Sequence, residues 1–260
     1  MKLQLEYFFA ALRFLTRLPV PAWVGHSSEQ LNHAARYFTL VGIVVGLVGG
    51  GVTWLAAQVL PASIAVLLGM AATLLATGAF HEDGLSDSVD GFGGGWEKLR
   101  ILEIMKDSRV GSFGAIAIAM ALLTKFAALH ELTRQAQLSV TVAALVAGHA
   151  LSRLASTSLL CLLDYVREDE LAKSKPLARK LSVGEWLCAA FFGLAPLAAL
   201  LWLGVDYRKV LVALALAVAV TLGAKRYLER HLGGYTGDCL GATQQLAELG
   251  VYIGLLCRFS

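Results

Sequence analysis

The sequence predicts an all-α fold: a polytopic bundle of about six or seven membrane-spanning helices, preceded by an amphipathic helix at the membrane interface. Of the 260 residues, 57% are apolar and 16% are charged, whereas soluble domains typically carry about 25% charged residues. The apolar residues form separate runs of about the 20 residues that a bilayer requires. We therefore expect residues 1–260 to form a single integral membrane domain. The net charge of +3 is small and gives no indication of nucleic-acid binding.

The amphipathic helix is expected over residues 1–18. Its leucines and phenylalanines cover much of the helical wheel, and Pro19 ends it. This pattern is typical of a helix that lies in the membrane interface with basic residues toward the headgroups. An ordinary amphipathic helix packed on protein is the alternative. The charged residues that share a narrow arc are Lys2, Glu6, Arg13 and Arg17.

The apolar runs predict the spanning helices in order. Gly42, Gly46 and Gly50 recur every four residues in the first run, which favours a close contact between two helices. Pro61 separates the first two runs, so we expect them to form a hairpin of two spans. Two glutamines and a glutamate interrupt the last run, which is therefore only a candidate seventh span. The predicted spans are 39–60, 62–80, 111–130, 138–163, 185–204, 209–224 and, as the candidate, 239–257.

Lysines and arginines are concentrated in the N-terminal segment and in every second connection after it. The connections after the first, third and fifth spans carry few of them. Because cytoplasmic segments of membrane proteins carry the excess of basic residues, we expect the N-terminus and the segment 81–110 to be cytoplasmic. The basic residues on that side are Lys2, Arg13, Arg17, Arg36, Lys98, Arg100, Lys106, Arg109, Arg167, Lys173, Lys175, Arg179, Lys180, Lys225, Arg226 and Arg230.

A dense group of carboxylates follows the second predicted span. Glu82, Asp83, Asp87 and Asp90 occur within nine residues, and the three aspartates have i, i+4, i+7 spacing. On a helix this spacing places them on one face, where like charges repel. A cation among them would relieve the repulsion, and Mg²⁺ held by carboxylates and shared with substrate phosphates is the default choice. We predict a metal site formed by these four residues, in a cytoplasmic acidic active-site loop over 81–110. A solvated acidic loop is the alternative.

Two cations and a carboxylate precede the third span. Lys106 and Arg109 are cationic side chains that could bind phosphate oxygens, and Arg109 could do so through two parallel hydrogen bonds. Ordinary cytoplasmic anchoring of the span would explain these two cations but not Asp107. Another basic segment, Lys173-Ser174-Lys175-Pro176, is expected to attract anionic lipid or anionic substrates.

Two further groups of residues could take part in chemistry. Arg153 lies in the middle of the fourth span, one turn after His149. A charge at membrane depth is costly, so Arg153 should face the bundle interior and reach either a substrate phosphate or a structural partner. Asp238 follows Thr236 in a glycine-rich segment before the last apolar run. It is a second candidate carboxylate at the membrane surface, or simply a helix cap.

These segments together resemble the cobalamin synthase family, whose members are adenosylcobinamide-GDP ribazoletransferases. The resemblance covers essentially the whole chain, and several separate motifs agree. The segments that carry it are Phe14–Pro19, His81–Gly95, Lys106–Gly114, Ser174-Lys175-Pro176, and Gly234-Tyr235-Thr236-Gly237-Asp238 with Leu240-Gly241-Ala242.

The resemblance implies a multi-pass inner-membrane enzyme that uses Mg²⁺. Such enzymes join adenosylcobinamide-GDP to α-ribazole or α-ribazole 5′-phosphate, release GMP, and form adenosylcobalamin or its 5′-phosphate. This is the last assembly step of the nucleotide loop in cobalamin synthesis. A ribazole hydroxyl must attack a phosphorus surrounded by negative charge, so metal ions and cationic side chains are the groups that the reaction requires.

Under this hypothesis the candidate residues have distinct roles. Asp83 and Asp87 bind metal next to the reacting phosphate, together with Glu82 and Asp90. Asp107 or Asp238 completes the metal shell or accepts the proton. Lys106 and Arg109 hold the pyrophosphate, and Arg153 and Thr236 are further phosphate-binding candidates.

Two other classes of membrane protein share part of this pattern. The CDP-alcohol phosphotransferases also have Asp-x-x-Asp-Gly, as in Asp87-x-x-Asp90-Gly91, but Gly94-Gly95 stands where their Ala-Arg should be. A cation transporter would carry its key charges within the spans and in repeated halves. Here the acidic residues lie beside the apolar runs, and no repeat is evident. The sequence leaves open whether the chain forms a homo-oligomer.

Overall fold

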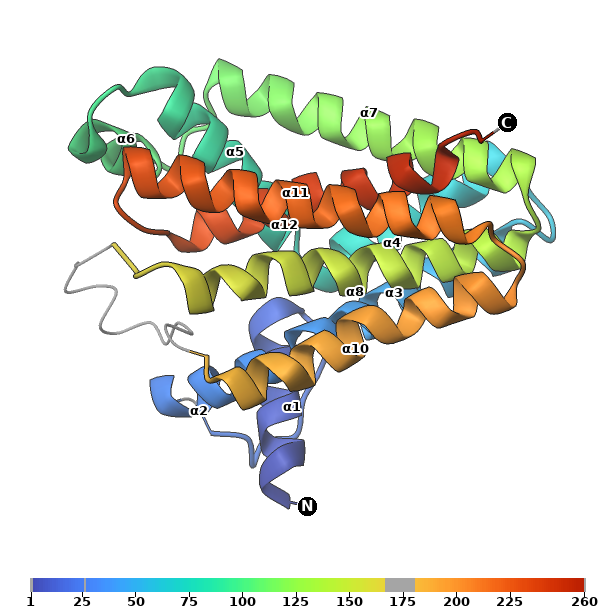
Figure 1. Cartoon of the computed structure of the whole chain (residues 1–260), viewed down its shortest axis with the longest axis horizontal. Helices are drawn as coiled ribbons and strands as arrows, with labels where there is room; N and C mark the ends of the chain where they lie inside the picture. Colours follow the sequence, from blue (N-terminus) through green and yellow to red (C-terminus); the bar gives the residue numbers. More distant parts are fainter. Residues whose placement is uncertain (1, 26, 167–180, 260) are drawn as a thin grey trace.

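The computed structural model describes residues 2–25, 27–166 and 181–259, and almost all of the regular structure in these residues is helical (Figure 1). They contain no named strand, only an isolated bridge between Tyr165 and Tyr235. The predicted all-α class is confirmed. The helices are α1 (Lys2–Leu15), α2 (Ser28–Ala34), the 3₁₀ helix η1 (Ala35–Tyr37), α3 (Phe38–Ala56), α4 (Ala62–Thr77), α5 (Phe80–Gly94), α6 (Lys98–Ile104), α7 (Ser112–Gln135), α8 (Leu138–Leu162), α10 (Val183–Trp202), α11 (Tyr207–His231) and α12 (Gly237–Leu256).

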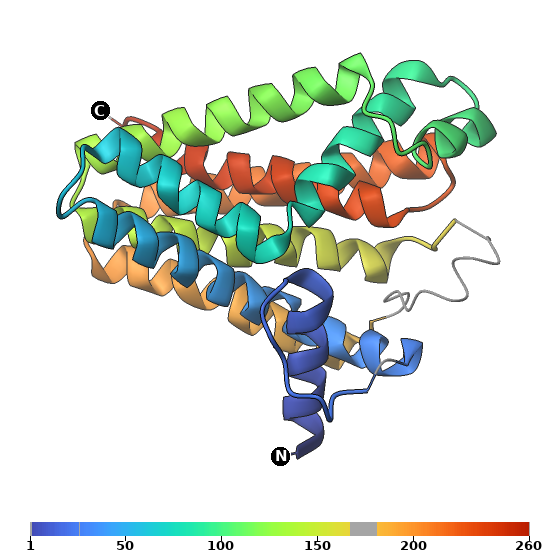
Figure 2. The ribbon, with the colours of Figure 1, turned by 180° about the vertical axis from the view of Figure 1, so that it is seen from behind.

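The long helices lie side by side in one bundle, and the connections alternate between its two ends (Figures 1 and 2). The α5–α6 region, the end of α8, the start of α10 and the α11–α12 connection share one end. The α3–α4, α7–α8 and α10–α11 connections and the C-terminus share the other. This is the alternation that the basic residues predicted. The segment Lys173-Ser174-Lys175-Pro176 lies outside the described residues.

Five helices in the described part of the chain are long and apolar enough to cross a membrane, and the bent pair α4–α5 could provide a sixth. The chain is therefore a multi-pass membrane protein. The first of the five runs from Glu29 to Ala56 and so includes α2, η1 and α3. The candidate seventh span, α12, is not among them. It lies inside the bundle against α5, α7, α8 and α11, with its polar residues buried.

The second predicted span does not continue straight to residue 80. Helix α4 ends at Thr77, Gly78 and Ala79 both have left-handed backbone with φ of 67° and 56°, and α5 leaves at 85° to α4. The linker after α1 covers this bend, where the Arg17 backbone N–H donates to the Ala76 carbonyl at 2.7 Å. Segment 81–110 is therefore not one loop: it begins with helix α5, which packs against α7 and α12.

Helix α1 lies at a steep angle to the long helices of the bundle in both ribbon views (Figures 1 and 2). Ala10, Ala11, Leu12 and Leu15 are buried in the same core cluster as residues of α3 and α8. One face of the amphipathic helix is thus packed on protein, as the alternative interpretation expected. Its placement at a membrane interface stays a prediction.

The glycine repeat of α3 makes the predicted close contact, and the partner is α8. A Cβ at Gly46 would lie 2.5 Å from Val146 Cα, and one at Gly42 would overlap the His149 carbonyl oxygen. A Cβ at Gly50 would lie 2.9 Å from Val142 Cγ1. Small residues allow the two backbones to approach, as in other membrane helix pairs.

We expect Gly46→Ala to destabilise the bundle by about 1–3 kcal/mol, because the added methyl group meets backbone atoms that cannot move independently. Thermal unfolding of the detergent-solubilised protein measures this. Gly51→Ala is the matched control, since a Cβ at Gly51 meets nothing within 4 Å. Equal midpoints for the two variants would contradict the prediction.

Candidate functional site

The candidate site lies where α5 crosses the start of α12. A Cβ at Gly84 would lie 2.9 Å from the Asp238 carbonyl oxygen, and one at Gly241 would lie 3.1 Å from the His81 carbonyl oxygen. Gly84 stands between Asp83 and Asp87, so this crossing brings Asp238 beside the turn that carries both aspartates. Asp83 is exposed, whereas Asp87 and Asp238 are half-buried. The two segments that carry these three candidate carboxylates therefore pack against each other at one end of the bundle (Figure 1).

Thr236 fixes the start of α12. It is completely buried, and its hydroxyl accepts a hydrogen bond from the Cys239 backbone N–H at 3.3 Å and donates one to Cys239 Sγ at 3.2 Å. The side chain is thus the N-cap of the helix that carries Asp238. The role of Thr236 as a phosphate ligand stays a prediction, because its hydroxyl is used to cap α12.

Asp90 anchors the start of α7. One carboxylate oxygen accepts the Gly111 backbone N–H at 2.7 Å and the other accepts the Gly114 backbone N–H at 2.8 Å. A carboxylate is favoured at a helix N-terminus because the unpaired N–H groups there carry partial positive charge. Asp90 was predicted to bind metal, but both of its carboxylate oxygens accept hydrogen bonds from backbone N–H groups. The partners lie 21 and 24 residues further along the chain, so local spacing could not identify them.

We expect Asp90→Ala to lower the free energy of unfolding by about 1–3 kcal/mol, because it leaves two backbone N–H groups without their acceptor. Thermal unfolding and limited proteolysis of the segment between α5 and α7 would measure the effect. Glu97→Ala is a suitable control, because Glu97 is exposed and makes no capping hydrogen bond at the start of α6. An unchanged midpoint for Asp90→Ala would refute the anchoring role.

Asp107 and Arg109 bind each other. Arg109 Nη2 donates to Asp107 Oδ2 at 2.6 Å, and Arg109 Nε donates to Asp107 Oδ1 at 3.0 Å. This pairing lowers the pKa of Asp107 to about 2, so the carboxylate is ionised at neutral pH. The Arg109 side chain is 87% exposed, and nearby Lys106 is also exposed. Both cations are exposed to solvent, and their role in binding phosphate stays a prediction.

Glu82 points away from the crossing, into the bundle. Its Oε1 accepts a hydrogen bond from Gln245 Nε2 at 2.9 Å and lies 3.9 Å from Lys125 Nζ. Lys125 in turn lies 3.1 Å from Glu248 Oε1. Lys125 was not among the residues predicted from the sequence, and Glu248 was expected only to weaken the last span. The available signal was a lysine inside an apolar run together with a glutamate inside another.

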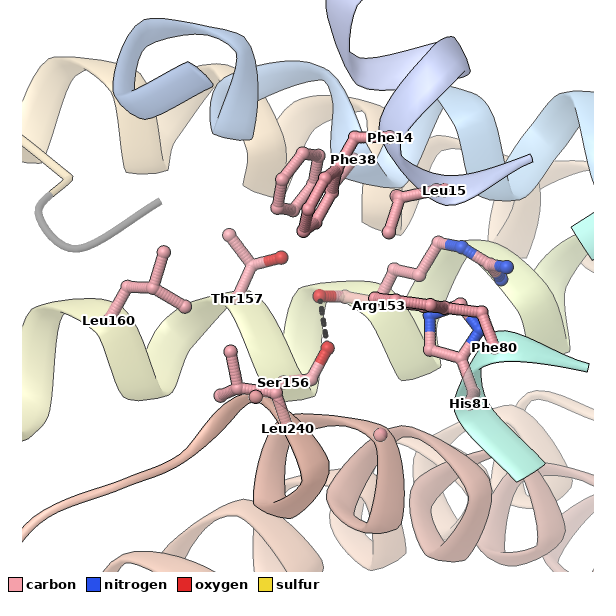
Figure 3. A pocket seen from close by; sticks show the side chains of 12 residues that line it. Phe14, Leu15, Phe38, Phe80, His81, Arg153, Ser156, Thr157, Leu160 and Leu240 are labelled. Atoms are coloured by element: carbon pink, nitrogen blue, oxygen red, sulfur yellow. Dashed lines mark hydrogen bonds between the residues drawn. The ribbon is translucent and has the colours of Figure 1, made fainter. Parts of the chain in front are cut away.

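Arg153 is buried in the bundle interior, as predicted, with 1% of its surface exposed. Its Nη1 donates to the His149 carbonyl at 3.0 Å. The side chain borders a pocket between α1, α3, α5, α8 and α12 (Figure 3). The rings of Phe14 and Phe38, stacked at 5.6 Å between centroids, form one wall, and Leu240 stands opposite. A phosphate-binding role for Arg153 stays a prediction.

The predicted four-carboxylate metal site is not assembled in the described residues, which contain no group of three or more His, Cys, Asp or Glu residues arranged to hold a metal ion. Glu82 and Asp90 have other partners. Asp83, Asp87 and Asp238 have the oxygen donors that Mg²⁺ prefers, and this ion commonly takes one or two carboxylates and completes its shell with water and substrate phosphate. The donor set at the crossing therefore fits a shared ion and not a closed protein cage.

Comparisons with known proteins agree on one family. A family model described as "Cobalamin-5-phosphate synthase" matches residues 7–256. The chain is 50% identical to the adenosylcobinamide-GDP ribazoletransferase of Shewanella amazonensis, over 100% of this chain and 98% of the relative. It is 47% identical to the protein of the same name from Shewanella frigidimarina, over 97% of this chain and 95% of the relative. No solved structure matches the chain.

Proposed function

Since the chain belongs to the cobalamin-5-phosphate synthase family, we propose that it is an adenosylcobinamide-GDP ribazoletransferase. The enzyme transfers the adenosylcobinamide phosphate group from adenosylcobinamide-GDP to α-ribazole or its 5′-phosphate and releases GMP. The observation that supports this most directly is the crossing of α5 and α12, where the backbone at Asp238 packs on Gly84, between Asp83 and Asp87 in the sequence. Carboxylates on two helices that pack together at the end of a membrane bundle are suited to a phosphate chemistry whose substrates are large and water-soluble.

Mg²⁺ is the proposed cofactor, and one or two of the carboxylates Asp83, Asp87 and Asp238 would hold it, with water and substrate phosphate completing its shell. When bound, it neutralises the pyrophosphate and stabilises the leaving phosphate. Lys106 and Arg109 bind the pyrophosphate oxygens from the exposed side. Asp107 holds Arg109 in an ordered position until substrate arrives. A carboxylate at the crossing that is not taken up by the ion accepts the proton of the ribazole hydroxyl.

We place the protein in the cell inner membrane with its N-terminus and the carboxylates in the cytoplasm. The support is the alternation of connections in the bundle, which agrees with the distribution of lysines and arginines. Substrate would then approach from the cytosol toward the end of the bundle that carries α6 and the start of α12.

The deciding experiment is an incubation of purified protein with Mg²⁺, adenosylcobinamide-GDP and α-ribazole. Appearance of GMP together with a corrinoid product supports the proposal. Parallel reactions with α-ribazole 5′-phosphate determine which acceptor is used faster. If CMP is released from a CDP-alcohol donor, or if no nucleotide is released from either donor, the proposed function is wrong.

A further inference from the structure

We propose that Lys125, paired with Glu248, is a positioning residue that fixes Glu82 and thereby the turn of α5 that carries Asp83 and Asp87. This inference rests on the proposed function, because the reaction is its readout. None of the three charged residues lies at the exposed crossing: Lys125 and Glu248 are 3% and 0% exposed, and the Glu82 side chain is 12% exposed.

The ammonium group of Lys125 lies between three oxygen atoms from two other helices. Its Nζ is 3.1 Å from Glu248 Oε1, 3.2 Å from Gln245 Oε1 and 3.9 Å from Glu82 Oε1. One cation on α7 therefore faces a carboxylate on α12 and a carboxylate on α5. Because a charge within a membrane bundle is costly, such a residue is retained only where its partners stabilise it.

Helix α12 connects these charges through a continuous set of hydrogen bonds. Gln245 Nε2 donates to Glu82 Oε1 at 2.9 Å and to Gln244 Oε1 at 2.8 Å. Gln244 Nε2 donates to Glu248 Oε2 at 2.9 Å and to Ser152 Oγ at 2.8 Å. Residues of α5, α7, α8 and α12 are thus held in one network, and Glu82 is the member that belongs to the helix of the candidate site.

The start of α5 needs such an anchor. The helix begins after an 85° bend, and its N-cap, Ala79, makes no side-chain hydrogen bond. The first turn of α5 is therefore not oriented by a regular cap. The glycine contact at Gly84 brings α5 close to α12. The contacts of Glu82 with Gln245 and Lys125 hold one side of the first turn of α5 toward α12 and α7 and so restrain its rotation. Asp83 follows Glu82 directly, so this rotation decides where its carboxylate points.

Stability alone does not explain the pair. Removing one partner of a buried ion pair is strongly destabilising, but replacing both by uncharged residues is often neutral or stabilising. If the pair had only a structural role, replacing both residues by uncharged ones would therefore leave turnover unchanged. If the pair positions Glu82, the same replacement lowers turnover, because it leaves Glu82 without its cation.

The test compares Lys125→Met with the double variant Lys125→Met/Glu248→Gln. The single variant is expected to lose both thermal stability and turnover. The double variant is expected to regain most of the lost thermal midpoint and still to show a kcat lowered roughly 10–100-fold, the usual effect of removing a supporting contact. The KM for adenosylcobinamide-GDP should change little, and the Mg²⁺ concentration for half-maximal rate should rise, because misplaced carboxylates bind the ion less well.

Two further variants keep the proposal open to refutation. Glu82→Gln retains an amide oxygen for Gln245 and loses the charge that faces Lys125, so it should fold and show the same loss of kcat. Thr39→Val removes a buried hydrogen bond between α3 and α10 and should lower stability with normal kcat. A wild-type kcat in either Glu82→Gln or a folded double variant overturns the proposal. Failure of the wild-type protein to release GMP would instead refute the proposed function.

Discussion

Asp87→Asn should lower the rate of GMP release by at least about 100-fold, because it removes a negative charge from the group of carboxylates that is proposed to bind Mg²⁺. Asp87 is one turn from Asp83 and three residues from Gly84, where α5 meets the start of α12. The substitution preserves the size of the side chain, so the variant should stay folded in the membrane. Steady-state GMP release at several Mg²⁺ concentrations measures the effect.

Glu103→Gln provides the matched control for this experiment. Glu103 is an exposed carboxylate of α6 that pairs with Arg100 at 2.7 Å, and exposed ion pairs of this kind contribute little to stability. The control should keep its turnover and its membrane level. Near-normal activity of Asp87→Asn, with a normal amount of the protein in the membrane, would contradict the proposed carboxylate site.

Gly84→Leu is expected to lower turnover by about 100-fold or more through geometry and not through charge. A Cβ at this position already lies 2.9 Å from the Asp238 carbonyl oxygen and 3.2 Å from Gly241 Cα. The backbone of α12 must therefore move away from α5, and a larger side chain increases the shift. A displacement of the order of 1 Å costs about 100-fold in rate when groups must act together. GMP release and thermal unfolding should be measured on the same preparation.

Gly94→Ala, on the same helix, is the control for the glycine experiment. There a Cβ would lie 3.2 Å from Ile104 Cδ1, the end of a flexible side chain that can move. Its turnover should remain within a few-fold of the wild-type value. If Gly84→Leu retained full turnover, the crossing of α5 and α12 would not be part of the site.

The order and type of the helices could be predicted from the sequence because they depend on local properties. Apolar runs of sufficient length specify spans, and the glycine spacing of α3 identified its contact face, which packs on α8. The alternation of basic residues matched the two ends of the bundle. Arg153 was expected in the interior and lies there, because the cost of a buried charge is a property of the residue itself.

The directions of the four acidic side chains could not be obtained in this way. Helical spacing grouped Asp90 with Asp83 and Asp87, but its oxygens accept hydrogen bonds from the start of α7. Glu82 turns inward to Gln245 and Lys125. Each partner comes from a distant part of the chain, and neither pairing has a local signal.

The sequence alone was enough to predict a helical membrane protein of one family, with its acidic and basic motifs gathered at one end. Hydropathy, charge asymmetry and motif order are properties of the linear chain, so they need no tertiary information. The bend between α4 and α5 at Gly78 and Ala79 and the contact of Asp238 with α5 at Gly84 became evident only in the folded chain. The same holds for the pairing of Lys125 with Glu248. These contacts depend on how closely two backbones approach and on where a buried charge finds its partner, and packing alone decides both.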